Sequence, residues 1–350
     1  MREFDVVVYG SYGYTGKLIV EKFKLLPLKI LLAGRDREKL SEQSRDTNLA
    51  FETVDIRDSE RLRALLLRSR IVLHCAGPFH ETAKQMIDAC IQTKTHYLDI
   101  TGEYLVFEML ARIDALAKAA GILVMPGVGF DVVPSDCLAL HLKNRLPDAR
   151  HLQLAFAMSG GGLSRGTART MVDGLGGGAM IRKDGMLQSI ALGSKTKRIS
   201  FCNHTKPTMC IPWGDISTAW RSTGIPNIEV YTTVSVATIA MAKVSRMFNW
   251  LLRMHAVKVI LKRRIDARPA GPSDEKRMSG RSFLWGQVRN SRGQHVEARL
   301  KTLSGYSLTA STSVLISAKL LNAEIRAGYF TPAEYFGEGL IFEVEGTEWC

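Results

Sequence analysis

The sequence lacks the features that mark several large protein classes. No apolar run in its 350 residues is long enough to cross a bilayer. Residues 1–5 pass directly into an apolar strand-like run, so we expect no secretory signal. The six cysteines include no C-x-x-C pair and no regular spacing, and several lie in apolar segments where cysteine usually acts as a small hydrophobic side chain. We therefore expect a reducing, cytoplasmic location.

Signatures of three functional classes are also missing. The eight histidines form no H-x-x-x-H or comparable cluster, so we expect no metal site. None of the nine tyrosines has a lysine four residues later, which excludes the Tyr-x-x-x-Lys pair that short-chain dehydrogenases need. The formal net charge is +13, with basic residues concentrated between Lys243 and Arg268, but no nucleic-acid motif accompanies them. We therefore expect no nucleic-acid partner. The composition is that of a globular protein large enough for two domains.

The chain opens with a strand, a tight turn and a helix. The apolar run at 6–8 leads into Gly10, Gly13 and Gly16, and an amphipathic helical pattern follows. Glycines let a pyrophosphate approach the backbone, and the helix N-terminus offers N–H groups to phosphate. The spacing differs from the usual G-x-G-x-x-G, and a plain strand–helix corner is the alternative interpretation. We predict that the cofactor contacts Gly10, Ser11, Tyr12, Gly13, Tyr14, Thr15 and Gly16.

A second apolar run at 28–33 ends in Gly34-Arg35-Asp36-Arg37. Dinucleotide-binding folds place the residue that meets the adenosine ribose here, roughly 20 residues after the glycines. An acid at this point binds the 2′-hydroxyl of NAD, whereas a guanidinium suits a 2′-phosphate. Gly34, Arg35 and Arg37 therefore predict NADP(H), although both arginines could merely lie at the start of a helix over 37–44.

Strands and helices continue to alternate up to Pro147. Near-continuous apolar strands that alternate with helices indicate a parallel sheet covered on both faces. Ligands of such sheets lie beyond the carboxyl ends of the strands, where 77–79, 101–103 and 127–131 fall. The expected strands are 51–54, 71–76, 96–100 and 122–125, and the expected helices are one capped by Ser59, 81–92 and 104–120.

Beyond Pro147 the pattern is that of an α+β domain with a partly antiparallel sheet. Ser164 and Thr167 read most economically as caps of a helix, with a substrate-facing role as the alternative. The glycines at 174 and 176–178 indicate a loop. The expected strands are 152–158 and 228–235 and a hairpin of 282–289 with 294–303, followed by a helix over 307–321 and a capping box at 331–334.

Five segments, in this order, resemble one known family. They are Gly-Ser-Tyr-Gly-Tyr-Thr-Gly at 10–16, Ala-Gly-Arg-Asp-Arg-Glu-Lys-Leu at 33–40, Ala-Gly-Pro-Phe at 76–79, His-Tyr-Leu-Asp-Ile-Thr-Gly-Glu at 96–103 and Gly-Phe-Asp-Val-Val-Pro-Ser-Asp at 129–136. Together they resemble the saccharopine dehydrogenase-like NADP-dependent oxidoreductases, particularly short bacterial members related to trans-acting enoyl reductases. The resemblance returns at 331–337. Tyr12 stands where the family usually has a small residue, and Val132 where serine is common. A large side chain at position 12 can crowd the turn.

The resemblance implies an enzyme that transfers a hydride to or from NADP(H). It places Ala76, Gly77, Pro78 and Phe79 near the nicotinamide ribose. It also implies a Rossmann-type domain over 1–147, an α+β substrate and dimerisation domain over 148–305, and C-terminal helices over 306–350 that return to the cofactor domain. We expect a homodimer. A catalytically silent NADP-binding sensor or scaffold is the alternative function.

Proton-transfer candidates lie at the strand ends. They are His80, Glu103, Tyr104 and Asp131. We predict Asp131 and Glu103 as the residues that shape the site, with His80 as a further catalytic candidate. His80 and Glu103 could instead cap or pair at helix starts, and Asp131 with Asp136 could fix the turn at 134–135.

The substrate stays open at this point. Arg165, Arg169 and Arg182 could clamp the carboxylates of a saccharopine-like substrate. An enoyl-lipid substrate would instead suit an apolar cleft formed by Met158, Met171, Met180 and Ile181. The stretch 240–265 reads as a basic amphipathic helix, which either contacts an anionic membrane or packs one face on the core.

Overall fold

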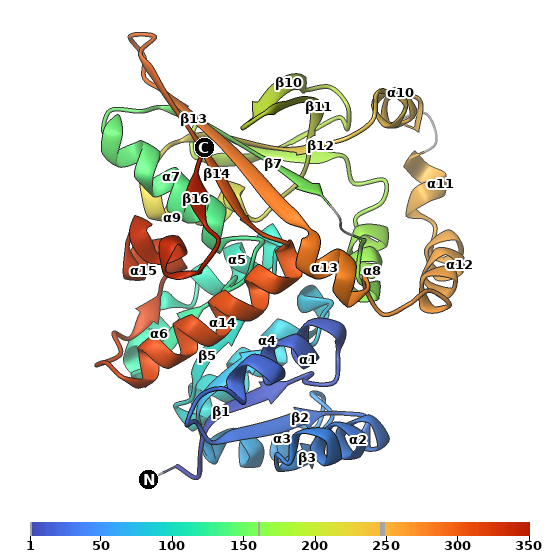
Figure 1. Cartoon of the computed structure of the whole chain (residues 1–350), viewed down its shortest axis with the longest axis vertical. Coiled ribbons are helices and arrows are strands. Elements are labelled where there is room, and N and C mark those ends of the chain that lie inside the picture. Colours follow the sequence, from blue (N-terminus) through green and yellow to red (C-terminus); the bar gives the residue numbers. More distant parts are fainter. Residues whose placement is uncertain (1, 160–161, 246–248) are drawn as a thin grey trace. The chain divides into compact units, whose positions relative to one another are not determined.

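The computed structural model describes residues 2–159, 162–245 and 249–350, and it divides the chain into two compact units (Figure 1). Unit 1 comprises Met1–Asp131 and Tyr306–Pro332, and unit 2 comprises Val132–Gly305 and Ala333–Cys350. The first boundary therefore falls at Asp131 and not at Pro147. The difference is helix α7 (Val133–Arg145), which packs on unit 2 through Leu138 and Leu142, the side chains nearest to Gly286. Of the C-terminal part, only Tyr306–Pro332 joins the cofactor domain.

Unit 1 is built on a seven-stranded sheet in the order β15-β6-β5-β4-β1-β2-β3. Every neighbouring pair is parallel, so all the carboxyl ends lie at one edge. This confirms the expected Rossmann-type sheet, to which β15 adds one short strand. The strands are β1 (Phe4–Tyr9), β2 (Ile30–Gly34), β3 (Phe51–Thr53), β4 (Ser69–His74), β5 (His96–Asp99), β6 (Leu123–Met125) and β15 (Gly328–Tyr329).

The helices of unit 1 follow the expected alternation, with two local differences. They are α1 (Tyr14–Phe23), α2 (Arg37–Thr47), α3 (Ser59–Leu67), α4 (Phe79–Thr93), α5 (Tyr104–Ala111), α6 (Asp114–Ala120) and α14 (Gly305–Leu321). The cap of α3 is Asp58, whose carboxylate accepts from the Arg61 N–H at 3.1 Å, and not Ser59. The single helix expected over 104–120 is two helices. Asp114, which begins the second, accepts the Tyr329 N–H of β15 at 2.8 Å.

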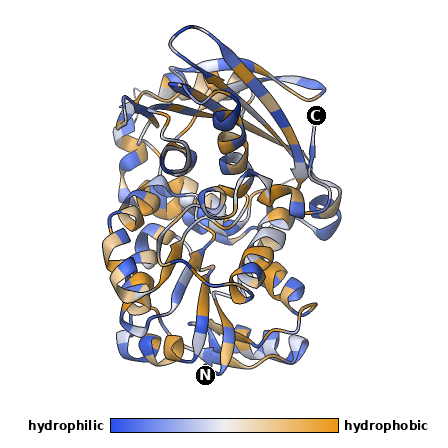
Figure 2. Cartoon of the chain, turned by 90° about the vertical axis from the view of Figure 1, so that its left-hand side faces the viewer, coloured by the Kyte–Doolittle hydropathy of each residue, from blue (hydrophilic) through white to orange (hydrophobic). Residues whose placement is uncertain are grey.

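Unit 2 contains a mixed nine-stranded sheet in the order β10-β11-β12-β7-β13-β14-β16, with β8 and β9 attached through β12. The pair β7–β12 is parallel and the other pairs are antiparallel. The hairpin β13–β14 was expected, and its strands alternate in hydropathy along their length (Figure 2). Strands β8–β11 have no counterpart in the sequence-based prediction. The bounds are β7 (His151–Ser159), β8 (Ala179–Lys183), β9 (Met186–Ile190), β10 (Thr196–Phe201), β11 (His204–Cys210), β12 (Asn227–Thr233), β13 (Arg281–Arg289), β14 (His295–Leu303) and β16 (Glu348–Trp349).

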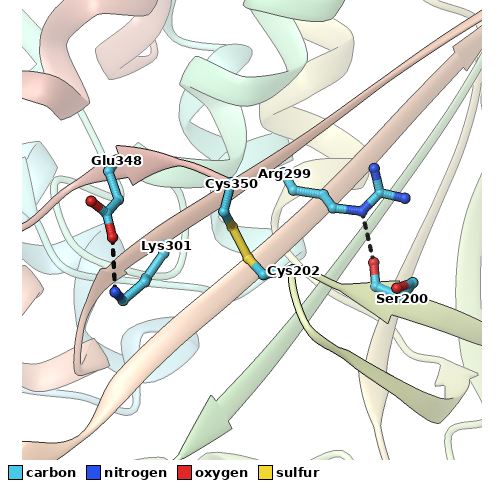
Figure 3. Close-up of a disulfide and its surroundings, with 6 residues drawn as sticks. All are labelled: Ser200, Cys202, Arg299, Lys301, Glu348 and Cys350. Atoms are coloured by element: carbon cyan, nitrogen blue, oxygen red, sulfur yellow. Dashed lines mark hydrogen bonds and ion pairs between the residues drawn. A yellow bond between two sulfur atoms is a disulfide. The ribbon is translucent and has the colours of Figure 1, made fainter.

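The two edges of this sheet meet. Strands β10 and β16 stand at opposite ends of the strand order, yet Cys202 after β10 forms a disulfide with Cys350 after β16 (Figure 3). Next to it, Arg299 Nε donates to the Ser200 carbonyl at 2.9 Å. An apolar cluster lies on one face of this sheet, which we call the inner face. The cluster consists of Ala155, Ile181, Ile199, Phe201, Cys210, Tyr231 and Trp285.

The disulfide corrects one expectation. Cys90, Cys137 and Cys210 are buried free thiols, as a small hydrophobic role predicts, and Cys75 is half-buried. Cys202 and Cys350 instead pair across 148 residues of sequence. Such a pairing depends on two sheet edges meeting, so cysteine spacing could not indicate it.

The remaining helices complete unit 2. They are α8 (Arg165–Asp173), α9 (Asp215–Thr223), α10 (Val236–Ser245), α11 (Asn249–Arg253), α12 (His255–Asp266), α13 (Asp274–Ser279) and α15 (Pro332–Phe336). A single basic helix was expected over 240–265. The described residues show an interruption at Met254, between α11 and α12, while 246–248 lie outside the described residues. Among the described helices, none has both the length and the apolar character needed to cross a bilayer.

Candidate cofactor and active site

The turn after β1 requires glycine at two positions. Gly10 has φ +84°, and a Cβ added there would lie 2.9 Å from the backbone nitrogen of Ala76. A Cβ at Gly16 would lie only 2.5 Å from the Gly10 carbonyl oxygen. The Gly10 N–H donates to the Ala33 carbonyl at 2.7 Å, and this bond ties the turn to β2. The turn is therefore a close-packed backbone corner at the carboxyl edge of the sheet.

Helix α1 begins at this corner without a side-chain cap. Its N-cap residue is Gly13, which has no side chain to accept from the first-turn N–H groups. Those N–H groups and the positive end of the helix dipole favour an anion. A glycine cradle leading into such a helix fits the pyrophosphate of a dinucleotide.

Gln43 of helix α2 holds the glycine turn in place, and the sequence analysis did not predict this role. The hydroxyl of Ser11 donates to Gln43 Oε1 at 2.8 Å, and Gln43 Nε2 donates back to the Ser11 carbonyl at 3.0 Å. Both side chains are buried. The amide of Gln43 therefore satisfies both polar groups of Ser11 and holds the turn in place.

Two arginines stand beyond the end of β2. Arg35 and Arg37 are both exposed, and within the described part of the chain neither side chain makes a hydrogen bond or an ion pair. The cap of α2 is Asp36, which accepts from the Lys39 N–H at 3.2 Å. The guanidinium groups are thus not needed to start the helix, and their position suits a 2′-phosphate.

Tyr12 lies across the end of β2. A Cβ added at Gly34 would stand 2.5 Å from Tyr12 Cε1, so the ring covers Gly34 closely. The ammonium of Lys39 stands 5.7 Å from the ring centroid. The Tyr12 ring is therefore directed to the side where the adenosine ribose is expected, and α1 keeps its open first turn.

Glu103 caps helix α4. Its carboxylate accepts from the Phe79 N–H at 2.8 Å and from the His80 N–H at 3.1 Å. The ring nitrogen Nδ1 of His80 lies 2.6 Å from the same carboxylate. Glu103 thus caps the start of α4 and pairs with His80, which is the alternative that the sequence left open for both residues. The peptide bond Gly77–Pro78, just before this helix, is cis.

Asp131 is a half-buried residue at the end of unit 1. A Cβ added at Gly102 would lie 2.5 Å from Asp131 Oδ2, which shows how closely the carboxyl packs on the loop after β5. Burial, together with the negative charge of Glu103, raises the pKa of Asp131 to about 7. A carboxyl with this pKa can hold and release a proton near neutral pH. The carboxylate of Asp136 accepts from the Ser222 hydroxyl at 2.5 Å and from the Ala333 N–H at 3.0 Å.

Asp99 braces the loops of this edge and was missed by the sequence analysis. Its carboxylate accepts from the Tyr97 hydroxyl at 2.6 Å and from the N–H groups of Thr101 and Gly127, each at 2.9 Å. The loops after β5 and β6 are therefore joined through one buried side chain. An aspartate at the last position of a buried strand is the signal that could have identified it.

The substrate candidates of unit 2 are only partly available. Arg169 forms an ion pair with Asp266 at 2.6 Å, and buried Arg182 donates to the Ile216 carbonyl at 2.6 Å. Ile181 belongs to the apolar cluster, whereas Met158 and Met171 are about half exposed, at 49% and 57%. Ser164 caps α8 by accepting from the Thr167 N–H at 3.2 Å, as the simpler interpretation predicted.

The parallel sheet, the glycine corner and the uncapped helix define a dinucleotide-binding protein of the Rossmann type. Residues 6–125 match the family model described as the saccharopine dehydrogenase NADP binding domain. With the similarity to the relatives described next, this match identifies residues 6–125 as a region similar to the NADP-binding domain of saccharopine dehydrogenase, which agrees with NADP as the expected cofactor.

Three comparisons illustrate the similarity. A lipid droplet localized protein of Caenorhabditis elegans is 29% identical over 55% of this chain and 51% of its own length. A trans-acting enoyl reductase of Mycobacterium leprae is 33% identical over 43% of this chain and 38% of its own. Saccharopine dehydrogenase (L-Glu forming) of Saccharomyces cerevisiae has a TM-score of 0.68 at 14% identity, covering 97% of this chain and 96% of that one, and so shares the fold. The chain spans about half the length, or less, of these two curated relatives.

Proposed function

We propose that the chain is an NADP(H)-dependent oxidoreductase that acts on an apolar, lipid-like substrate. The observation that carries this proposal is the uncapped start of α1 behind the glycine corner, together with the unpaired Arg35 beyond β2. When bound, the nicotinamide cofactor supplies or accepts the hydride. The first-turn N–H groups of α1 would hold the pyrophosphate, and Arg35 with Arg37 would hold the 2′-phosphate.

Asp131 is the proton donor of this proposal. Reduction of a C=C or C=O bond adds a proton as well as a hydride, so the site needs a group that carries a proton at neutral pH. Asp131 packs closely on the loop after β5 and has a pKa of about 7. The carboxylate of Glu103 already accepts from the first N–H groups of α4. Together with His80, Glu103 would position the segment 77–79.

Three observations support a lipid-like substrate over a saccharopine-like one. Arg169 and Arg182 are engaged inside unit 2 and are poorly placed to clamp free carboxylates. Met158 and Met171 expose apolar side chains. One relative is named an enoyl reductase and another is named for lipid droplets.

Peripheral attachment to a lipid surface is a second proposal, carried by helices α10–α12. Their exposed apolar side chains include Trp250 at 66% and Met241 at 66%. We also propose that the chain forms a homodimer. The sequence predicts a cytoplasmic location, but the Cys202–Cys350 disulfide counts against it, because thiols are kept reduced in the cytoplasm.

Calorimetric titration with NADPH and NADH tests the cofactor assignment. We expect micromolar NADPH binding and weak NADH binding by the wild-type protein. Arg35→Asp should weaken NADPH binding at least tenfold and spare NADH, because an acid repels the 2′-phosphate. Arg45→Asp, which makes the same charge change at the far end of α2, is the matched control and should bind NADPH as the wild type does.

If Arg35→Asp binds NADPH as tightly as the wild type does, Arg35 does not contact the 2′-phosphate. NADPH binding without turnover of enoyl, keto and imino substrates would favour the alternative of a catalytically silent sensor. Turnover of enoyl or keto lipids, but not of amino-acid imines, is the result expected from a lipid-like substrate.

A further inference from the structure

Unit 2 contains a cavity that is separate from the proposed cofactor site. It has a volume of about 330 Å³ and is lined only by residues of unit 2. The strand register places Gln287, Gln153 and Glu229 side by side on β13, β7 and β12. Arg289, His151 and Asn227 form the next row toward the sheet end. Because residues two apart share a face, both rows continue the inner face outward from the apolar cluster.

The lining is strongly positive. Its charged residues are Arg182, Lys183, Lys195, Lys197 and Arg289 against the single carboxylate of Glu229. The guanidinium of Arg182 donates to the carbonyls of Ile216 and Gly185, so the other four supply the cations for a ligand. The carboxylate of Glu229 pairs with Lys195 and accepts from the Tyr231 hydroxyl at 2.5 Å and from Gln153 Nε2 at 2.8 Å. The negative charge of Glu229 is therefore balanced by Lys195. The remaining cations of the cavity are left to attract an anionic ligand.

Lys183 and Arg289 are the cations best placed for a ligand. Both are exposed, and within the described residues neither side chain makes a hydrogen bond or an ion pair. Lys197 donates only to the neutral amide oxygen of Gln153 at 2.5 Å. Burial and then the charge of Arg289 lower the pKa of His151, in keeping with a positive field at this end of the sheet.

The inner end of the cavity limits what can enter. The next row inward is Trp285, Ala155 and Tyr231, and these side chains are buried in the apolar cluster. A ligand therefore stays among the polar rows. There the cations suit a phosphate. The amides of Gln153, Asn227 and Gln287 each make bonds within the protein, and their second N–H and lone pairs are the groups that could meet the hydroxyl groups of a ligand.

We propose that this cavity binds a small, hydroxyl-bearing organic phosphate. The site belongs to unit 2 alone and does not depend on the proposed cofactor or reaction. A second copy of the chain is a poor occupant, because a symmetric contact over this face would set the cations of one copy against those of the other.

Isothermal titration with glycerol 3-phosphate tests the proposal, in saturating NADPH so that the dinucleotide site is filled. The variant Lys183→Gln/Arg289→Gln should bind the probe at least tenfold more weakly than the wild type, with unchanged thermal stability because both side chains are exposed. The matched control is Arg63→Gln/Lys84→Gln, which removes two exposed charges from unit 1 and should bind as the wild type does. If NADPH itself does not bind, the comparison of the cavity variant with the control variant still tests the cavity, because neither variant changes the glycine corner or Arg35.

A vesicle experiment distinguishes a free metabolite from a lipid headgroup. Binding of glycerol 3-phosphate, but not of phosphatidic acid vesicles, that is lost in the cavity variant supports a soluble ligand. Vesicle binding lost in the same variant supports a headgroup. Absence of both in the wild type, or equal losses in the cavity and control variants, overturns the proposal.

Discussion

Asp131 shows how burial sets the chemistry of a single side chain. Its pKa of about 7 lies above the ordinary value of 3.8, chiefly because burial penalises the charged carboxylate. The folded protein therefore binds a proton at Asp131 that the unfolded chain has already lost between about pH 4 and pH 7. The contribution of this group to stability is full below pH 4 and declines as the pH rises through that window.

This loss of stability with rising pH can be tested without a substrate. The free energy of unfolding of the wild type, relative to Asp131→Asn, should fall between pH 4 and pH 7 by up to about 1.4 kcal/mol per pH unit. Urea unfolding at several pH values measures the difference. Asp46→Asn, at an exposed position on α2, is the control and should follow the wild type. Parallel curves for the wild type and Asp131→Asn would show that Asp131 does not titrate in this range.

At the residue scale, the sequence indicated the groups whose role is written in their type. Gly10 and Gly16 were predictable because only glycine allows the backbone corner. The place of Arg35 just beyond β2 was also predictable, and its contact with the cofactor stays a prediction. Gln43 and Asp99 were not predictable. Each acts by meeting backbone groups of another segment, and Gln43 lies 32 residues from Ser11. Such partners follow from the folded arrangement and leave no local pattern.

At the scale of elements, Glu103 supports a helix to which it does not belong. Glu103→Ala should lower the free energy of unfolding by about 1–2 kcal/mol, because the Phe79 and His80 N–H groups lose their acceptor. His80→Ala is the control. It removes the ring contact and keeps both backbone bonds, so its cost should be smaller. Equal losses in a urea titration would assign the stabilisation to the His80–Glu103 pair rather than to the cap.

Helices and strands of unit 1 were predictable because apolar periodicity is local, and the errors occurred where tertiary contacts decide. The break before Asp114 coincides with its bond to β15, a two-residue strand that reaches the sheet from the far end of the sequence. Strands β9 and β10 were missed because they are short and expose much of their length, so they lack an apolar signal. The closure of their sheet also depends on contacts distant in sequence.

At the scale of the whole molecule, the net charge of +13 includes basic residues without an ion-pair partner in the part of the chain that the structure describes, and several of them lie on helices α10–α12 or just after them. Helices α10–α12 expose several apolar side chains: Val236, Met241, Val244, Trp250, Leu251, Met254 and Ile260. Lys258 and Lys262 contact Asp173, so they are already engaged. Lys243, Arg263, Arg264 and Arg268 are exposed or half-buried, and their side chains make no hydrogen bond or ion pair within the described residues. Apolar groups beside unpaired cations suit an anionic lipid surface.

The vesicle prediction follows from this combination. The wild type should bind vesicles rich in phosphatidylglycerol, and more weakly as salt rises, because surface charges are screened. Trp250→Ser/Leu251→Ser should reduce the bound fraction at least fivefold in a flotation assay, because both side chains contribute apolar area to the interface. Leu25→Ser is the control, since Leu25 is 81% exposed on unit 1. If both variants float like the wild type, α10–α12 do not dock on lipid, and their exposed side chains belong to another interaction.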